Sequence, residues 1–190
     1  TAGEVHLGLR RDVGLAELRE LVDRQDTETL LDLLHRIPVA AGDRVYVPPG
    51  VLHAIGDGVL LTEVQEPEDL SILLEWRDFD LDGTVDGHLG LGFDKALLAV
   101  ERTGRTAAEI DALIVRADAA GAGLPAAADV YFRLERVDVA GPTELGSGFA
   151  VLVVLDGLVH LPGPGGPLTL PAGRTALLPA GCIERTVDGT

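Results

Sequence analysis

A spacing that occurs twice constrains the fold of this chain more than any other feature of its sequence. The stretches AGDRVYVPPGVLHAI (residues 41–55) and AGRTALLPAGCIERT (residues 172–186) share one frame. In each, a glycine is followed by five residues, a proline, one residue, a second glycine, two residues and a polar side chain. The first copy ends on His53 and the second on Glu184. Two copies of one frame predict two related β units.

The first copy also has a chemical meaning. Gly42 turns the chain into a strand, and Pro48 and Gly50 then force a tight reversal. The strand that follows aims the imidazole of His53 into the interior of the β unit. A neutral imidazole in a dry interior is a good ligand for a borderline divalent metal.

The segments around the two copies predict short helices and further strands. GEVHLGL (3–9) reads as a strand, and DVGLAELRELVDR (12–24) as an amphipathic helix with Asp12 as its N-cap. DTETLLDLLHRI (26–37) reads as a second helix, capped by Asp26 or Thr27 and ended by Pro38. A third helical piece is predicted at 106–120, followed by a connector at 119–129. Strands are predicted at 44–50, 59–65, 71–76, 130–141, 149–161, 167–173 and 174–181.

Composition narrows the class of protein. With 190 residues and 46% hydrophobic residues the chain has enough apolar material for a packed core. A formal net charge of −16 disfavours nucleic acid and anionic membrane surfaces as partners. The single cysteine excludes an internal disulfide, and no apolar run reaches the length of a membrane helix, so we expect a cytoplasmic protein. The chain contains no methionine and opens in mid-pattern, which suggests part of a longer polypeptide.

The frame resembles the second motif of the cupins, small jelly-roll barrels that commonly hold one metal. The longer stretch YVPPGVLHAIGDGVLLTEVQEPEDLS (46–71) resembles the type I mannose-6-phosphate isomerases, in particular their short bacterial branch. The matching positions are Pro48, Gly50, His53, Ala54, Ile55, Gly56, Gly58, Glu63, Gln65 and Asp69. Residues 2–9 and FDKAL (93–97) also resemble segments of that family.

The resemblance implies a mainly β fold of two jelly-roll (cupin) units with helical insertions, the first unit being incomplete. On this interpretation residues 1–100 form the C-terminal part of the first cupin, with a helical insertion at about 12–37. Residues 101–128 form a helix and linker, and residues 129–190 form a second, degenerate cupin.

The resemblance also implies a zinc-dependent aldose–ketose isomerase of carbohydrate metabolism. His53 matches one metal ligand, and the family's other three ligands are expected upstream of Thr1, so the fragment alone should be inactive. His6 lies in the wrong local frame to replace them. The implied substrate is a small sugar or sugar phosphate, mannose 6-phosphate in the family.

Three polar residues after His53 are candidates for the chemistry. Asp69 matches an acidic residue at the family's active site and would act as a general acid or base, although it could equally cap the next turn. Glu63 and Gln65 alternate with apolar residues, so both should point to one face, which we expect to be the cavity. Glu63 is then a catalytic candidate and Gln65 a ligand of sugar hydroxyls.

One position departs from the family. An arginine is usual four residues after that aspartate, where this chain has Leu73. Arg77 is the nearest replacement for binding phosphate. The departure leaves open whether the sugar is phosphorylated.

The second copy predicts no metal site. Glu184 stands where the first copy has His53, His160 reads as a surface strand residue, and Cys182 as a packed thiol. The acidic loop at 78–90 lacks the spacing of an EF-hand calcium loop.

Other classes stay open. The chain could be a non-catalytic cupin module that binds sugar or regulates, an isomerase of a non-phosphorylated or different sugar, or a cupin enzyme such as a dioxygenase or epimerase. The sequence leaves the metal and the oligomeric state undetermined.

Overall fold

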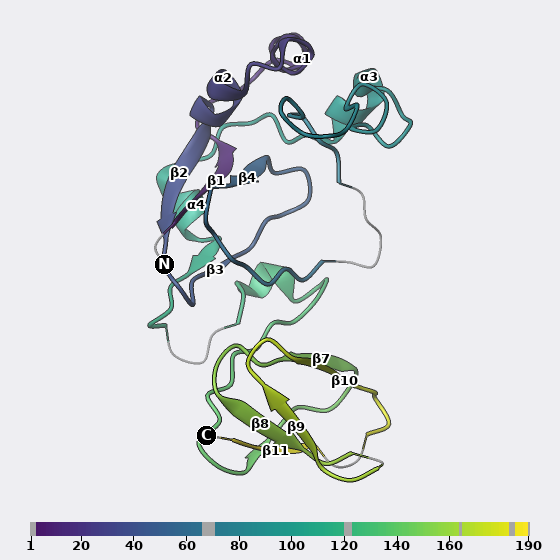
Figure 1. Cartoon of the computed structure of the whole chain (residues 1–190). Coiled ribbons are helices and arrows are strands. Elements are labelled where there is room, and N and C mark those ends of the chain that lie inside the picture. The colour runs from purple at the N-terminus through teal and green to yellow at the C-terminus, as the bar shows by residue number, and fades with distance from the viewer. Residues whose placement is uncertain (1–2, 66–70, 120–122, 164, 183–184, 190) are drawn as a thin grey trace. The chain divides into compact units, whose positions relative to one another are not determined.

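A computed structural model describes residues 3–65, 71–119, 123–163, 165–182 and 185–189 (Figure 1). The fold is mainly β, as predicted, with antiparallel strand pairs and short helices. The chain divides into two compact units, unit 1 (Thr1–Arg136) and unit 2 (Val137–Thr190). The identity of these units as jelly rolls stays a prediction, as do the segment boundaries at 100 and 128.

Unit 1 is organised around an antiparallel sheet with the strand order β2-β1-β4. The central strand β1 (Gly3–Leu9) confirms the strand predicted at 3–9. It is flanked by β2 (Leu34–Val39) and by the short strand β4 (His53–Ile55). His53 therefore lies on a strand, directly after the first copy of the frame.

The two faces of this sheet differ in polarity. Leu7 of β1 lies opposite His35 on one side and His53 on the other, so these three side chains share a face. Leu7 and Ile37 on that face are buried. The other face carries an ion pair between Arg36 and Glu4 at 2.5 Å. The face that carries His53 packs on the core at β1 and β2, whereas His53 and Ile55 of the edge strand β4 are exposed on it.

Helix α1 (Leu15–Arg24) confirms the first predicted helix, but its cap differs from the prediction. Gly14 occupies the N-cap position and makes no side-chain cap. The carboxylate of Asp12 instead accepts a hydrogen bond from the backbone N–H of Gly104 at 2.8 Å. Asp12 therefore ties the start of the helix to a distant segment, which local pattern cannot reveal.

The second predicted helix is half right. Helix α2 covers only Thr27–Asp32, with Asp26 as N-cap accepting from the N–H of Thr29 at 3.3 Å. Hydrogen bonds from the side chain and then the backbone N–H of Thr29 hold the pKa of Asp26 below its usual value. The remainder, predicted as helix, is strand β2, because Leu34–Val39 finds a hydrogen-bonding partner in β1. Tertiary pairing overrides the local helical pattern there.

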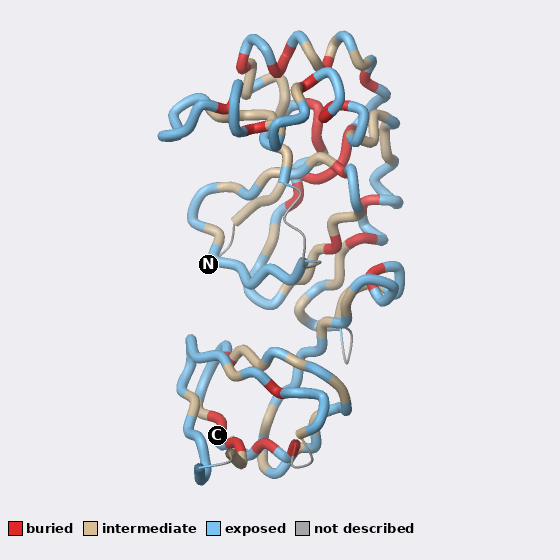
Figure 2. The backbone as a smooth tube through the Cα atoms, turned by 90° about the vertical axis from the view of Figure 1, so that its right-hand side faces the viewer, coloured by how far each residue is buried: buried red, intermediate tan, exposed pale blue. Residues whose placement is uncertain are grey.

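Two apolar clusters fill unit 1, and their buried residues are red in Figure 2. One joins α1 and β2 to helix α3 (Phe93–Ala96) and the 3₁₀ turn η1 (Leu97–Ala99). Its buried members are Leu9, Val13, Leu18, Leu21, Val22, Leu33, Leu34, Phe93, Ala96 and Leu97. The other lies under the sheet and contains Leu7, Ile37, Tyr46, Val51, Ile110, Leu113 and Ala128.

The predicted third helix ends early. Helix α4 covers Ala107–Asp111, with Thr106 and Glu109 forming a reciprocal capping box. After it the chain forms strand β5 (Ile114–Val115), which pairs with β3 (Arg44–Val45). β3 is all that forms of the strand predicted at 44–50. The connector that follows contains a 3₁₀ turn, η2 (Ala126–Ala128).

Three predicted strands, at 59–65, 71–76 and 130–141, are wrong. Their sequences have strand-like composition, but none is paired in a ladder with a strand of the described residues. A strand is stabilised by hydrogen bonds to its neighbour, so a favourable pattern without a neighbour leaves an irregular segment.

Unit 2 contains six short strands within its described residues. The stretch predicted as strand at 149–161 splits into two, separated by a bend, and the next two predicted strands are confirmed. Four strands form a sheet of order β6-β11-β8-β9, and two form the pair β10-β7. The strands are β6 (Thr143–Glu144), β7 (Ala150–Val153), β8 (Leu158–Leu161), β9 (Leu168–Pro171), β10 (Thr175–Leu178) and β11 (Thr186–Gly189). Their core contains Val154, Val159, Leu161, Leu178 and Val187.

The two copies of the sequence frame open with the same turn. The N–H of Asp43 donates to the carbonyl of Ala40 at 3.1 Å, and at the same frame positions Arg174 donates to Pro171 at 3.1 Å. The frame's first glycine has a positive φ in both, +90° in copy one and +81° in copy two. This backbone conformation favours glycine, which explains that position of the frame.

The second turn of the frame also repeats. The N–H of Val51 donates to the carbonyl of Pro48 at 3.1 Å, and Cys182 donates to Pro179 at 2.9 Å. In the first copy Gly50 has φ +80°, and a Cβ there would lie 2.6 Å from the carbonyl oxygen of Ala99. The repeat read from the sequence therefore exists as a repeat of backbone hydrogen bonds.

The carboxylate of Asp43 fastens the opening turn of the first copy. It accepts from the N–H of Ala40 at 3.1 Å, from the N–H of Ala117 at 2.9 Å and from Arg116 at 2.8 Å. Its side chain is only 6% exposed. Burial by itself raises the pKa of Asp43, but the hydrogen bonds from Arg116, Ala40 and Ala117 outweigh it, so the pKa lies below its usual value.

No helix in the described part of the chain is long and apolar enough to span a membrane.

Gly50→Ala should destabilise the chain more than Gly58→Ala. Both glycines have similar positive φ values, +80° and +74°, so both substitutions incur the left-handed backbone penalty of about 1 kcal/mol. Only the Cβ at position 50 meets a neighbour, since nothing lies within 4 Å of the one at position 58. We expect urea unfolding to show a loss of about 2–4 kcal/mol for Gly50→Ala. Equal losses in the two variants would contradict the steric role of the turn.

We expect the free energy of unfolding to fall in acid, because the Asp43 carboxylate accepts its hydrogen bonds in the ionised form. Its folded-state pKa is lowered, so its contribution is complete above the unfolded pKa of about 3.9 and is lost as pH falls through the folded value. Asp43→Asn should lower the free energy of unfolding by about 1–3 kcal/mol at neutral pH. It should also flatten the fall below about pH 4. The exposed Asp57→Asn is the control, and parallel pH profiles for wild type and Asp43→Asn would refute the assignment.

Candidate functional site

His53 opens strand β4 directly after the Pro48–Val51 turn, as the frame predicts. Its Nδ1 lies 3.1 Å from the carbonyl oxygen of Val51. A carbonyl only accepts, so Nδ1 carries the hydrogen, and a neutral ring keeps its lone pair on Nε2. A backbone carbonyl that fixes the tautomer in this way is typical of metal-ligating histidines. The ring is exposed at the edge of the sheet, so the dry interior that the sequence predicted around it is not formed by the described residues.

His6 lies on the opposite face of the same sheet. It pairs with Ala54, whereas His53 pairs with Leu7, the next residue along β1. Because successive side chains of a strand point to opposite faces, His6 and His53 diverge. This register agrees with the exclusion of His6 as a ligand.

The described residues do not make up a complete zinc site. Among them, no three histidine, cysteine, aspartate or glutamate side chains come together in a metal-binding arrangement. His53 fits zinc as one nitrogen ligand through its Nε2, but a protein zinc site requires three or four ligands. The role of His53 as one ligand of such a site stays a prediction.

The structure leaves the roles of Glu63 and Gln65 as predictions. Both side chains are exposed, and they lie on the segment 59–65, which forms no strand. Residues 60–65 are all exposed, and Leu60 is 97% exposed, so this stretch is not packed on the described core. Alternating residues share a face only in a strand. Because residues 59–65 form no strand, the pattern does not place Glu63 and Gln65 on one face. Asp69 lies outside the described residues.

Arg77 is placed against the end of helix α1. Its Nη2 donates to the carbonyl of Arg24, the last residue of that helix, at 2.8 Å. A cation at this end is favoured by the helix dipole. One guanidinium nitrogen thus has a structural use, and binding of phosphate by Arg77 stays a prediction. Leu73 is partly exposed, and its N–H donates to Gly87 at 2.8 Å.

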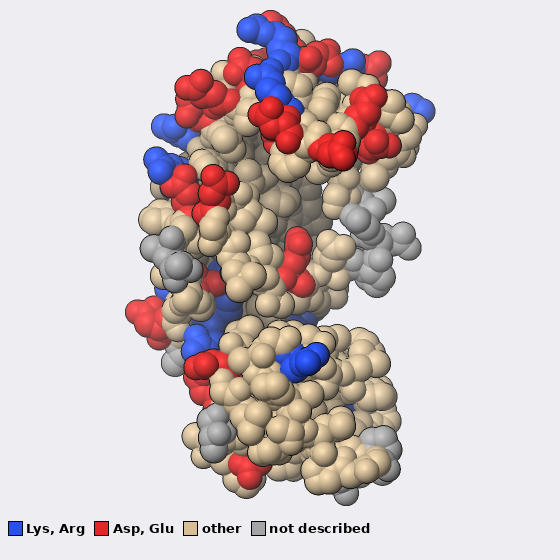
Figure 3. Space-filling model, in the orientation of Figure 1, with Lys and Arg blue, Asp and Glu red and all other residues tan. Residues whose placement is uncertain are grey.

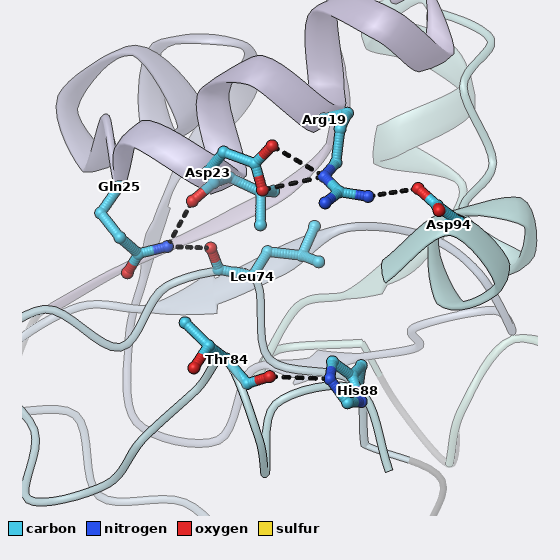
Figure 4. Close-up of polar contacts among 8 residues, drawn as sticks. Arg19, Asp23, Gln25, Leu74, Thr84, His88 and Asp94 are labelled. Atoms are coloured by element: carbon cyan, nitrogen blue, oxygen red, sulfur yellow. Dashed lines mark hydrogen bonds and ion pairs between the residues drawn. The ribbon is translucent and has the colours of Figure 1, made fainter. Parts of the chain in front are cut away.

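Gln25 fastens the segment after Asp69 to helix α1, a role that no sequence motif announced. Its amide nitrogen donates to the carbonyls of Val22 at 2.8 Å and Leu74 at 3.1 Å. Its amide oxygen accepts from the N–H groups of Trp76 at 2.7 Å and Arg77 at 3.1 Å. Gln25 is 8% exposed and has φ +50°. Four hydrogen bonds offset this strained conformation. Figure 4 shows the amide pointing at the Leu74 carbonyl.

We call Gln25 and its four hydrogen bonds a clamp. A cavity of about 340 Å³ lies beside it, between α1 and the segment that leads into α3. The guanidinium of Arg19 lies between two carboxylates (Figure 4). Its Nε lies 2.8 Å from both oxygens of Asp23, and its Nη1 pairs with Asp94. The hydrogen bond with Asp23 raises the pKa of Arg19 further above its usual value. The cation that lines this cavity is therefore already paired.

His88 and two aromatic rings complete the cavity wall. The Nε2 of His88 lies 2.9 Å from the carbonyl of Thr84, and its Nδ1 accepts from the N–H of Gly92 at 3.2 Å. Trp76 and Phe93 stack with ring centroids 5.3 Å apart. These contacts hold the turns at 78–92 against α3. We interpret the cavity as a structural joint.

The polar residues singled out in unit 2 behave as predicted where the structure describes them. His160 is exposed on β8, with its Nδ1 3.0 Å from the hydroxyl of Thr169. Cys182 is half-buried and packs against the core of unit 2. Glu184 lies outside the described residues.

Comparison with known proteins gives a consistent set of relatives, although no family model matches the chain. A putative mannose-6-phosphate isomerase, YvyI, of Bacillus subtilis is 28% identical over 179 residues, 92% of this chain and 54% of the relative. A mannose-6-phosphate isomerase of Streptococcus mutans is 41% identical over 70 residues, 37% of this chain and 20% of the relative. The chain thus spans a fifth to about half of the length of these relatives.

Two solved structures share the fold. One is a putative mannosephosphate isomerase from Archaeoglobus fulgidus, with a TM-score of 0.65 at 20% identity, covering 100% of this chain and 55% of that one. The other is the mannose 6-phosphate isomerase of Bacillus subtilis, with a TM-score of 0.60 at 22% identity, covering 99% of this chain and 58% of that one.

These relatives define the class: the chain is similar in sequence and fold to sugar-phosphate isomerases. More particularly, its curated relatives are named mannose-6-phosphate isomerases, the family that residues 46–71 resemble.

Gln25→Ala should destabilise unit 1 and free the segment that carries Trp76. Loss of the buried amide leaves two backbone N–H groups and a carbonyl without their partner, which costs about 2–4 kcal/mol. Urea unfolding measures this loss, and the emission of Trp76, the chain's single tryptophan, should shift to the red.

The matched control is Gln65→Ala, which removes the same side chain from an exposed site and should change stability by no more than about 0.5 kcal/mol. Equal stabilities of the two variants would show that Gln25 is not a clamp.

Proposed function

We propose that this chain is part of a metal-dependent isomerase that interconverts mannose 6-phosphate and fructose 6-phosphate by moving a proton between C1 and C2. The observation that carries the proposal is His53. It follows the Pro–Gly turn that the resemblance singled out, and its ring is held in the tautomer that leaves Nε2 for a metal. The similarity to isomerases supports the choice of reaction.

The roles of the site residues follow from their chemistry. His53 would hold zinc together with ligands expected upstream of Thr1, and zinc, when bound, polarises the oxygens on C1 and C2 of the sugar. Asp69 and Glu63 would move the proton, because carboxylates act as general acids and bases. Gln65 would bind sugar hydroxyls. We include a cytoplasmic location in the proposal.

Binding of the phosphate is the weakest match to the family, since Leu73 replaces the usual arginine. Arg77 would supply the cation, although one of its nitrogens is used at the end of α1. A non-phosphorylated or different sugar is therefore the alternative substrate that Leu73 favours.

The test compares this chain with the natural polypeptide that contains it. We expect the 190-residue chain to be inactive and the longer polypeptide, stripped by chelator and reloaded with zinc, to convert fructose 6-phosphate. His53→Ala should lower kcat/KM by at least about 100-fold.

His160→Ala is the control, because that ring lies on a strand surface of unit 2 and should leave activity unchanged. Activity only on free mannose and fructose would assign a non-phosphorylated substrate. Binding of sugar without turnover of either pair would refute the isomerase and favour a sugar-binding module.

A further inference from the structure

Arg185 is the one charged residue that is buried as a whole among the residues that the structure describes. It is 4% exposed and immediately precedes strand β11. The only other buried polar residue in that part of the chain, Gln25, has all its amide groups paired. A buried charge without a partner is strongly unfavourable, so proteins pair such groups with an opposite charge.

The guanidinium of Arg185 is satisfied on one side only. Its Nη1 donates to the carbonyl of Pro179 at 3.3 Å. Its Nε and Nη2 are buried and have no hydrogen-bond partner among the described residues. These two nitrogens carry parallel N–H groups, the pair that binds two oxygens of a carboxylate or phosphate at once. The unused edge therefore has the geometry of an oxyanion receptor.

Arg185 lies next to a turn with open space beside it, in a unit with one other basic residue. Pro179 begins the turn that ends at Cys182, and a Cβ built on Gly181 in this turn meets nothing within 4 Å. The guanidinium thus lies next to a turn that borders open space. In residues 137–190 the only lysine or arginine residues are Arg174 and Arg185, and Arg174 is exposed. Charged side chains are sparse on the face of unit 2 that Figure 3 shows.

We propose that Arg185 anchors an oxyanion-binding site in unit 2, with its Nε–Nη2 edge on two oxygens of a phosphate group. The site lies at the second copy of the frame, one residue after the position that His53 occupies in the first. The frame that presents the predicted metal ligand His53 in unit 1 thus presents a cation in unit 2. This site is distinct from the proposed isomerase chemistry and does not rest on it.

The experiment follows thermal unfolding of the chain at rising inorganic phosphate and constant ionic strength, with chloride as the balancing anion. A ligand that binds only the folded state raises the melting temperature. We expect a saturable rise of about 5 °C for the wild type at phosphate about 100-fold above its Kd. Phosphate that shifts wild type and Arg185→Met equally would overturn the proposal.

Arg185→Met removes the charge but keeps the length of the side chain. In phosphate-free buffer it should melt at the same temperature as the wild type or higher, because an unpaired buried cation has been removed. It should also lose the response to phosphate. A strongly lowered melting temperature or failure to fold would show that Arg185 has a partner within the chain, and would overturn the proposal as well.

Two further variants sharpen the test. Arg174→Met removes the other arginine of unit 2 from an exposed position, so it should keep the full response to phosphate. Loss of the response in this variant would mean that net charge, and not the Arg185 edge, attracts phosphate. Arg185→Lys keeps the charge without the parallel N–H pair and should need about 10-fold more phosphate.

Other ligands then identify the source of the oxyanion. Mannose 6-phosphate that acts at the same concentration as inorganic phosphate shows a site for the phosphate group alone. Mannose 6-phosphate that acts at about 10-fold lower concentration shows a site for the sugar phosphate. Acetate that acts alone, without any effect of phosphate, would overturn the choice of phosphate.

Discussion

The hydrogen bond between Pro48 and Val51 is the constraint on which the placement of His53 depends. It closes a turn whose glycine must adopt a positive φ and has no room for a side chain. The carbonyl of Val51, the last residue of this turn, then accepts the hydrogen of the His53 ring. One local turn thus sets the path of strand β4 and the tautomer of its first side chain. Both hydrogen bonds join residues close in sequence, which is why the turn before His53 could be predicted from the sequence.

Gln25 acts over a longer range. It ends helix α1 and holds the chain at residues 74–77, so the helical insertion and the segment after Asp69 are fastened to each other. Arg77 strengthens the same joint from the other side by donating to Arg24. Motion of the helices relative to this segment would break the hydrogen bonds that Gln25 and Arg77 make across the joint. Residues 74–77, which follow the predicted acid–base residue Asp69, are therefore held against the end of α1 by hydrogen bonds.

The parts of the fold that could be predicted from the sequence are those held by interactions between residues close together in the chain. Strand β1, helix α1 and both turns of the frame were predicted, because glycine, proline and local periodicity determine them. Strand β2 was predicted as helix, since its conformation depends on pairing with β1, about 30 residues away. Gln25, Asp43 and Arg185 gave no signal, because a buried polar side chain is recognised only by what surrounds it. Glu63 and Gln65 remain candidate site residues, but they lie on no strand that would direct their side chains to one face.

In the repeated frame, the residues that form the turns differ from the residue that ends the frame, which is His53 in one copy and Glu184 in the other. Both copies of the frame keep their glycines and prolines, and the first glycine has a positive φ in both, while in the first copy neither turn uses the side chain of His53. That position can therefore change without altering the path of the chain. After a duplication, one copy is free to keep a histidine while the other drifts to glutamate. The fold thus contains a position where new specificity can evolve at little risk to folding.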